Sequence, residues 1–344
     1  MPRPFPLRTL AAAVAAALLL VACRPAGEAS PVPSGPDASK APVALTVGLG
    51  YIPSVQFAPF YLAQQRGYYS SAGLAVTFQN KIDPDLVTLV GAGSIDIGVA
   101  DGTSVIPARS QGIPIKYVAT IYGTFPSIVF AKASSGITSA ADLAGKKIGI
   151  PGKYGSSWVM LQALLGSADL KVDDATVVEY PDFGQGVAVQ QGAVDAATGF
   201  ANNEPVQMEL AGTDAVVLHV DDVVALPGPG LIVSDATLAA KERAIAGFVS
   251  ATLEAMREIA ADPSSGLDAA IAAVPELGSQ RDTQAAILDA TIATWSAPGG
   301  TADSFGAIDR DGWQASIEYL SKLGLVKNPV KVDDLVQRVL AEPL

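Results

Sequence analysis

The segment from 149 to 157, GIPGKYGSS, is a glycine-bearing turn that leads into a predicted helix. The free amide groups at the start of such a helix, together with the hydroxyls of Ser156 and Ser157, can bind an anion or a carbonyl oxygen. Lys153 can neutralise a phosphate or sulfonate there, or remain solvated. A capped helix without a ligand is the alternative interpretation.

Two other turns place polar side chains directly after predicted strands. Asp101 follows one strand in the sequence ADGT, where it can cap the next helix or face a cleft. Phe200, Asn202 and Glu204 follow another strand in the sequence FANNE. A buried carboxylate needs a partner, so Glu204 is expected to meet either a ligand amine or hydroxyl, or a hinge hydrogen-bond donor.

Aromatic residues are the third feature with chemical meaning. The loop GYIPSVQF, which starts at Gly50, contains Tyr51, Gln56 and Phe57. Tyr51 or Phe57 can stack on a flat ligand, although Phe57 can also belong to the core. If half of the following residues face a cleft, the ligand is a flat heterocycle rather than an inorganic anion: Tyr51, Phe57, Tyr122, Phe125, Tyr154 and Phe200.

Catalytic machinery is not visible in the sequence. The single histidine, His219, ends an apolar strand without a serine, cysteine or acid at a recognisable spacing. The sequence has no P-loop, HExxH or CxxC motif. The only cysteine is Cys23, which excludes an internal disulfide and a thiolate zinc cluster. We therefore predict no catalytic residue, no cofactor and no metal site.

Strand and helix patterns alternate in two sets, which predicts an α/β fold. The chain is expected to cross from lobe 1 near Ala131 and to return near Leu231, so that two segments form a hinge. Lobe 1 then comprises residues 44–130 and 231–344, with a helical C-terminal portion, and lobe 2 comprises residues 131–230. The cleft is expected at the carboxyl ends of the strands, where open α/β sheets bind ligands.

The N-terminus predicts export. Arg3 and Arg8 precede an apolar run over residues 10–22, which is too short for the roughly 20 residues that span a bilayer, so residues 1–22 indicate a signal peptide. The ending LVAC resembles the bacterial lipobox, which implies that Cys23 is lipidated, with palmitate among its acyl chains. Residues 23–43 are expected to form a flexible tether at the outer side of the cell membrane.

The charge excludes one class of partner. The formal net charge is −12, and removal of the signal with its two arginines leaves −14. Nucleic acid is therefore not an expected partner. Membrane association should come from the lipid on Cys23 and not from a basic patch.

Several segments, in order, resemble the receptors of ABC importers for thiamine-precursor pyrimidines, riboflavin, alkanesulfonates, taurine and nitrate. The matching segments are 63–69 (AQQRGYY), 73–76 (GLAV), 90–102 (VGAGSIDIGVADG), 142–157 (DLAGKKIGIPGKYGSS) and 201–205 (ANNEP). The resemblance implies a type II periplasmic-binding-protein fold. It also implies capture of a small molecule for a permease and an ATPase, which must be separate chains because no 20-residue apolar span follows Cys23.

The resemblance favours a ligand of vitamin type, either riboflavin or a hydroxymethylpyrimidine. The loop lacks the aspartate–tryptophan pair often seen in the pyrimidine receptors and has Gly50 and Tyr51 in its place, which favours riboflavin. An alkanesulfonate, taurine or nitrate receptor is the first alternative. A pyrimidine-synthesising enzyme of the same fold uses a cysteine-rich motif that this chain cannot form, and a structural lipoprotein would not need a hinged cleft.

Overall fold

The computed structural model describes residues 41–82 and 85–340, which belong to one compact unit. The predicted signal peptide, Cys23 and all but the end of the predicted tether lie outside the described residues.

The first of two mixed sheets has the strand order β2-β1-β3-β10-β4. The neighbours β1–β2 and β1–β3 are parallel, whereas β10 is antiparallel to both β3 and β4. The strands are β1 (Val43–Gly50), β2 (Leu74–Ile82), β3 (Ile97–Ala100), β4 (Ile115–Thr120) and β10 (Gly230–Ser234).

The residues of the first sheet alternate between two hydrophobic cores. In β10, Leu231 and Val233 join one core cluster, whereas Ile232 joins the other. All three are fully buried because helices cover both faces of the sheet. One face packs on α1 and α8, and the other on α3, α4 and α11.

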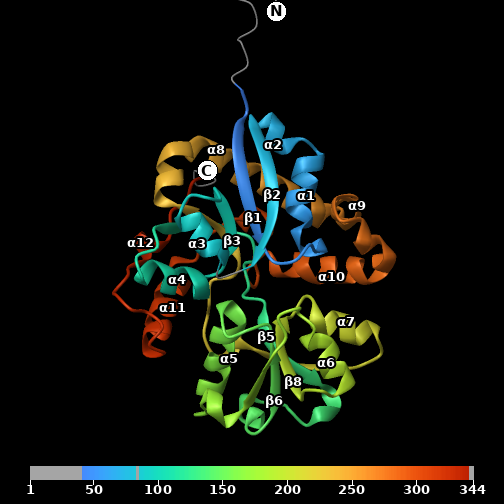
Figure 1. The fold of residues 1–344 in the computed structure, drawn as a ribbon. Helices are drawn as coiled ribbons and strands as arrows, with labels where there is room; N and C mark the ends of the chain where they lie inside the picture. Colours follow the sequence, from blue (N-terminus) through green and yellow to red (C-terminus); the bar gives the residue numbers. More distant parts are fainter. Residues whose placement is uncertain (1–40, 83–84, 341–344) are drawn as a thin grey trace, which may run out of the picture. The chain divides into compact units, whose positions relative to one another are not determined.

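Nine helices of the described chain surround this sheet, most of them from the C-terminal part (Figure 1). They are α1 (Ala58–Gln65), α2 (Tyr68–Ser71), α3 (Asp85–Gly91), α4 (Gly102–Ser110), α8 (Asp235–Ala261), α9 (Pro263–Ala273), α10 (Arg281–Thr294), α11 (Arg310–Lys322) and α12 (Val332–Leu335).

The second sheet has the strand order β7-β6-β8-β5-β9, and its residues also alternate between two hydrophobic cores. In β5, Ile128 and Phe130 join one core cluster while Val129 and Ala131 join another. Figure 1 shows α5 on one side of this sheet and α6 and α7 on the other. The elements are β5 (Ser127–Lys132), β6 (Lys147–Ile150), β7 (Thr176–Glu179), β8 (Ala196–Phe200), β9 (Ala215–His219), α5 (Gly155–Ser167), α6 (Gln185–Gln191) and α7 (Glu204–Leu210).

We call the elements on the first sheet lobe 1 and those on the second sheet lobe 2. The chain enters lobe 2 between β4 and β5 and leaves it between β9 and β10. The expected crossing near Ala131 differs from this, because Ala131 lies inside β5, which pairs with β8 and β9. The expectation was wrong because β5 is defined by pairing with strands that are distant in sequence, and local periodicity does not reveal such pairing.

The predicted α/β fold class is confirmed. The two crossing segments are tied together where the Phe125 backbone N–H donates to Asp221 Oδ2 at 3.1 Å. Burial raises the pKa of Asp221 to about 6, while the hydrogen bond from Phe125 opposes that increase.

Candidate ligand-binding site

Residues of both lobes line one cavity at the carboxyl ends of several strands. Its empty volume is about 1010 Å³, part of which is open to solvent. Within the described chain, this cavity is therefore the candidate site for a small ligand.

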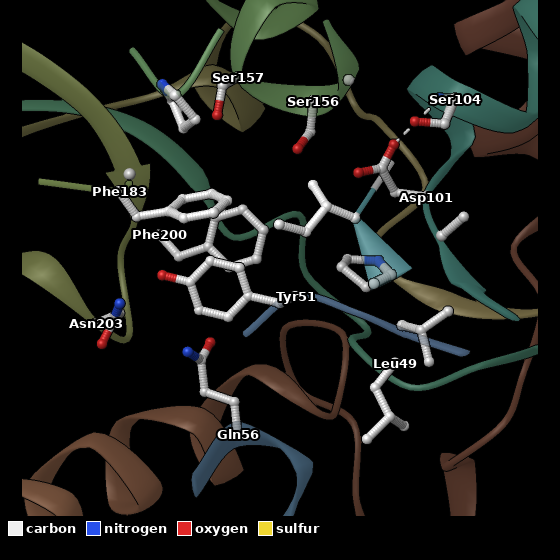
Figure 2. Close-up of a pocket in the computed structure, with 18 of the residues that line it drawn as sticks. Leu49, Tyr51, Gln56, Asp101, Ser104, Ser156, Ser157, Phe183, Phe200 and Asn203 are labelled. Atoms are coloured by element: carbon white, nitrogen blue, oxygen red, sulfur yellow. Dashed lines mark hydrogen bonds between the residues drawn. The ribbon is translucent and has the colours of Figure 1, made fainter. Parts of the chain in front are cut away.

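Aromatic side chains from both lobes contribute to the lining of this cavity. The Tyr51 and Phe183 rings meet edge to face across the two lobes, with centroids 4.8 Å apart and an interplanar angle of 81°. Figure 2 shows Tyr51, Phe183 and Phe200 in one part of the view and Asp101 with Ser104 in another. Six aromatic residues line the cavity: Tyr51, Phe57, Tyr122, Tyr154, Phe183 and Phe200.

Phe183 is held in an unusual backbone conformation. Its φ is 60°, in the left-handed region that non-glycine residues rarely adopt. A turn hydrogen bond from its N–H to the Tyr180 carbonyl, at 2.9 Å, fixes this geometry just before α6. Such strain commonly occurs at functional sites, where the surrounding structure enforces it.

The beginning of α5 faces the cavity. Its N-cap residue, Tyr154, makes no side-chain capping bond, and Gly155 has a φ of 59° that suits glycine. Ser156 and Ser157 point toward the centre of the view in Figure 2, and both line the cavity. The start of this helix can therefore donate hydrogen bonds to ligand oxygen atoms.

Asp101 both caps a helix and lines the cavity. Its Oδ1 accepts from the backbone N–H of Thr103 at 2.9 Å and of Ser104 at 3.3 Å, at the start of α4. Only 7% of its surface is exposed. The two interpretations of this residue are thus compatible, because the side chain that caps α4 also lies at the cavity wall.

Glu204 is the second carboxylate of the lining. Its Oε2 accepts from the Phe200 backbone N–H at 2.8 Å. A Cβ at Gly199 would lie 2.7 Å from that same oxygen, so glycine makes room for the carboxylate. Burial raises the pKa of Glu204 to about 7, against the lowering effect of the hydrogen bond from Phe200.

Nine of the eleven predicted ligand-binding residues line the cavity, and that they bind a ligand stays a prediction. The nine are Tyr51, Gln56, Phe57, Asp101, Tyr154, Ser156, Ser157, Phe200 and Glu204.

Phe125 and Asn202 lie outside the lining. Phe125 is packed in a hydrophobic cluster of lobe 2 because it sits where the chain enters that lobe. Asn202 instead joins the lobes: its Nδ2 donates to Gln56 Oε1 at 3.0 Å and to Thr291 Oγ1 at 2.8 Å. We call these two hydrogen bonds the Asn202 bridge.

Sequence reasoning missed several lining residues. Leu49, Ile82 and Val99 lie at or near the carboxyl ends of β1, β2 and β3, a position that the rule for open α/β sheets points to. Phe183 and Gln185 gave no such signal, because a positive-φ turn and tertiary packing orient them.

Metal ligands and membrane-spanning helices are two further features that could carry a function. Within residues 41–82 and 85–340, no cluster of three or more histidines, cysteines or acids is placed to hold a metal ion. In the same part of the chain, no helix is long and apolar enough to cross a membrane.

Solved structures define the class of fold. The alkanesulfonate-binding protein SsuA from Xanthomonas axonopodis pv. citri, bound to MOPS, matches with a TM-score of 0.68 and 20% identity, over 87% of this chain and 99% of that chain. The periplasmic aliphatic sulphonate binding protein SsuA from Escherichia coli matches with a TM-score of 0.68 and 20% identity, over 85% and 96%. This chain thus has the fold of the periplasmic solute-binding proteins.

Sequence comparison defines the family. Residues 54–265 match the family model described as NMT1/THI5 like. The riboflavin-binding protein RibY of Chloroflexus aurantiacus is 34% identical over 337 residues, 95% of each chain. A 4-amino-5-hydroxymethyl-2-methylpyrimidine phosphate synthase of Legionella pneumophila is 27% identical, over 68% of this chain and 74% of that protein. The chain belongs to the NMT1/THI5-like family.

Proposed function

We propose that this chain is the extracytoplasmic solute-binding component of an ABC importer and that it captures riboflavin. The observation that carries the proposal is the grouping of six aromatic side chains, from both lobes, around one cavity. Each well-placed aromatic pair contributes about 0.5–1.5 kcal/mol beyond the burial of its area, so a flat tricyclic ring gains from such a lining. The chain binds a solute and is not an enzyme.

Similarity to RibY over nearly the whole chain supports this ligand. The cavity also supplies polar groups that suit the vitamin. Carboxylates at Asp101 and Glu204 accept hydrogen bonds from ribityl hydroxyls or a ring N–H, while Ser156 and Ser157 can donate to ring carbonyls. A bound ligand that touches both lobes would stabilise their closed arrangement.

A thermal-shift screen tests the proposal. The purified protein is heated with riboflavin, hydroxymethylpyrimidine, thiamine, taurine, an alkanesulfonate or nitrate. At 100 times its dissociation constant, the true ligand adds about 2.7 kcal/mol of stability. We expect the shift with riboflavin. A shift only with a sulfonate or nitrate would contradict the aromatic-cavity argument.

The membrane part of the proposal rests on the N-terminal sequence. Residues 1–22 would direct export, lipid on Cys23 would anchor the protein, and residues 23–43 would tether the two lobes within reach of a separate permease and ATPase. Cys23→Ser should move the protein from the membrane fraction to the soluble fraction of cells, whereas Ser30→Ala in the tether should not. Membrane retention of the Cys23→Ser protein would contradict lipid anchoring.

A further inference from the structure

The cavity carries acidic side chains without basic ones. Asp101 and Glu204 belong to its lining, and among the described lining residues there is no lysine, arginine or histidine. Lys153, the cation next to the α5 turn in sequence, lies outside the lining with its Nζ 5.8 Å from the centroid of the Trp158 ring. The ionisable groups that a ligand meets are therefore acids and tyrosines.

Both carboxylates are fixed in place. Asp101 is held by the first backbone N–H groups of α4, and Glu204 by the Phe200 N–H in the space that Gly199 leaves open. Neither can move far from a bound ligand without breaking these bonds. Carboxylates accept hydrogen bonds and do not donate them when ionised, so their best partners are hydroxyl and N–H groups.

A phosphate ester has the opposite chemistry. It carries about −1.5 to −2 charges at pH 7 and offers strong acceptor oxygens. The start of α5 is the part of the lining that favours an anion, with a partial charge of about half a unit. Two fixed carboxylates in the same cavity, each with a full unit of charge when ionised, outweigh that partial charge.

We propose that the cavity selects riboflavin in its unphosphorylated form and that Asp101 and Glu204 reject its phosphate ester. This inference rests on the proposed function and adds the chemical form of the ligand. The carboxylates act as specificity-determining residues: they accept hydrogen bonds from the neutral vitamin and repel the charged ester.

Quenching of flavin fluorescence measures the two affinities in parallel. The full chain is titrated with riboflavin and with riboflavin 5′-phosphate at pH 8 and fixed salt. We expect the ester to bind at least 100-fold more weakly. In the Asp101→Asn, Glu204→Gln double variant the ratio should shrink by at least 10-fold, because the amides keep the acceptors for the backbone N–H groups but lose the charges.

Glu209→Gln is the matched control, since it removes a charge from the exposed part of the same helix, α7. It should leave the ratio unchanged, and thermal melts of all variants report whether they fold. Equal wild-type affinity for both flavins would overturn the inference and leave the proposed function intact. A ratio that the double variant does not change would also overturn it, whereas absence of binding to either flavin would overturn the proposed function itself.

Discussion

At the scale of a single residue, Glu204 makes the stability of the folded protein depend on pH. Its pKa rises from 4.5 to about 7 on folding because burial disfavours the carboxylate. Between these values the folded protein binds more protons than the unfolded chain. The stability contributed by this group is therefore complete below about pH 4.5 and is lost as the pH rises toward 7.

Glu204→Gln should remove this loss of folding stability at high pH. We expect the variant to be more stable than the wild type at pH 8 by on the order of 1–3 kcal/mol, with the difference fading toward pH 4.5. Denaturant unfolding at pH 4.5, 6 and 8 measures it. Asp221, whose raised pKa acts in the same direction, is present in both proteins and cancels in the comparison. A difference that does not depend on pH would contradict the assignment.

Phe183 gives a second prediction at this scale. Phe183→Leu keeps an apolar side chain but removes the ring that meets Tyr51. We expect riboflavin affinity to fall by about 3- to 10-fold, the equivalent of one aromatic contact. Tyr68→Leu, in α2 of lobe 1 and outside the cavity lining, should leave the affinity unchanged. Equal losses in both variants would indicate a general loss of structure instead.

Individual site residues differ in how well sequence could predict them. Tyr51, Asp101 and Phe200 end or follow strands, and that position is readable from the alternation of apolar residues. Phe183 was not predictable, since its ring position depends on a turn with positive φ. Asn202 also follows β8, but tertiary contacts direct its side chain to Gln56 and Thr291 rather than into the cavity.

Among the elements, β10 is the first strand after the chain returns from lobe 2, and it completes the first sheet. Gly230 pairs with both Ala100 in β3 and Thr120 in β4, where a Cβ would lie 2.2 Å from Tyr117 Oη and 2.3 Å from the Ala119 carbonyl oxygen. Position 230 therefore has no space for a side chain.

Gly230→Ala should therefore destabilise the protein by at least about 2 kcal/mol, the range of an overpacked core. Denaturant unfolding gives the value. Gly166→Ala is the control, because a Cβ at that position in α5 meets no atom within 4 Å, and alanine in a helix is favoured over glycine by about 0.5–1 kcal/mol. The expectation fails if both substitutions have the same sign.

The Asn202 bridge is the second prediction for the elements. It connects the start of α7 in lobe 2 to η1 (Val55–Phe57) and α10 in lobe 1. Two buried hydrogen bonds contribute about 1–3 kcal/mol in total. Asn202→Ala should thus weaken riboflavin binding by about 10-fold and increase the radius of gyration of the unliganded protein in small-angle scattering.

Asn328→Ala is the control that separates an effect on lobe closure from an effect on folding stability. The Asn328 side chain donates to the Ser110 carbonyl within lobe 1, so its loss should lower the melting temperature without changing affinity. If Asn202→Ala behaves in the same way, the bridge stabilises the fold and has no role in lobe closure.

Sequence predicted most elements for physical reasons that can be named. β1 (Val43–Gly50) has alternating apolar residues and a glycine at its end, which is a local pattern that the sequence alone displays. Ser139 caps only a short 3₁₀ turn, Ala140–Leu143. β5 was missed because it is central in its sheet and depends on β8 and β9, both distant in sequence.

At the scale of the whole molecule, the two lobes and the cavity explain how a chain without visible catalytic groups has a specific role. The relatives of this chain include both a binding protein and a pyrimidine phosphate synthase. The synthase's reaction requires reactive groups at the site, whereas capture requires only a closing cavity with complementary walls. The described lining combines aromatic and aliphatic side chains with hydroxyls, amides and two carboxylates, which fits capture.

Direct titration of the full chain with riboflavin, followed by quenching of flavin fluorescence and by calorimetry, tests the central claim. We predict saturable binding of one riboflavin per chain with a dissociation constant of about 1 μM or lower, equivalent to about −8 kcal/mol or better, and a negative heat-capacity change from burial of the flat ring. Absence of saturable riboflavin binding by a folded protein that does bind a sulfonate or nitrate would contradict the claim.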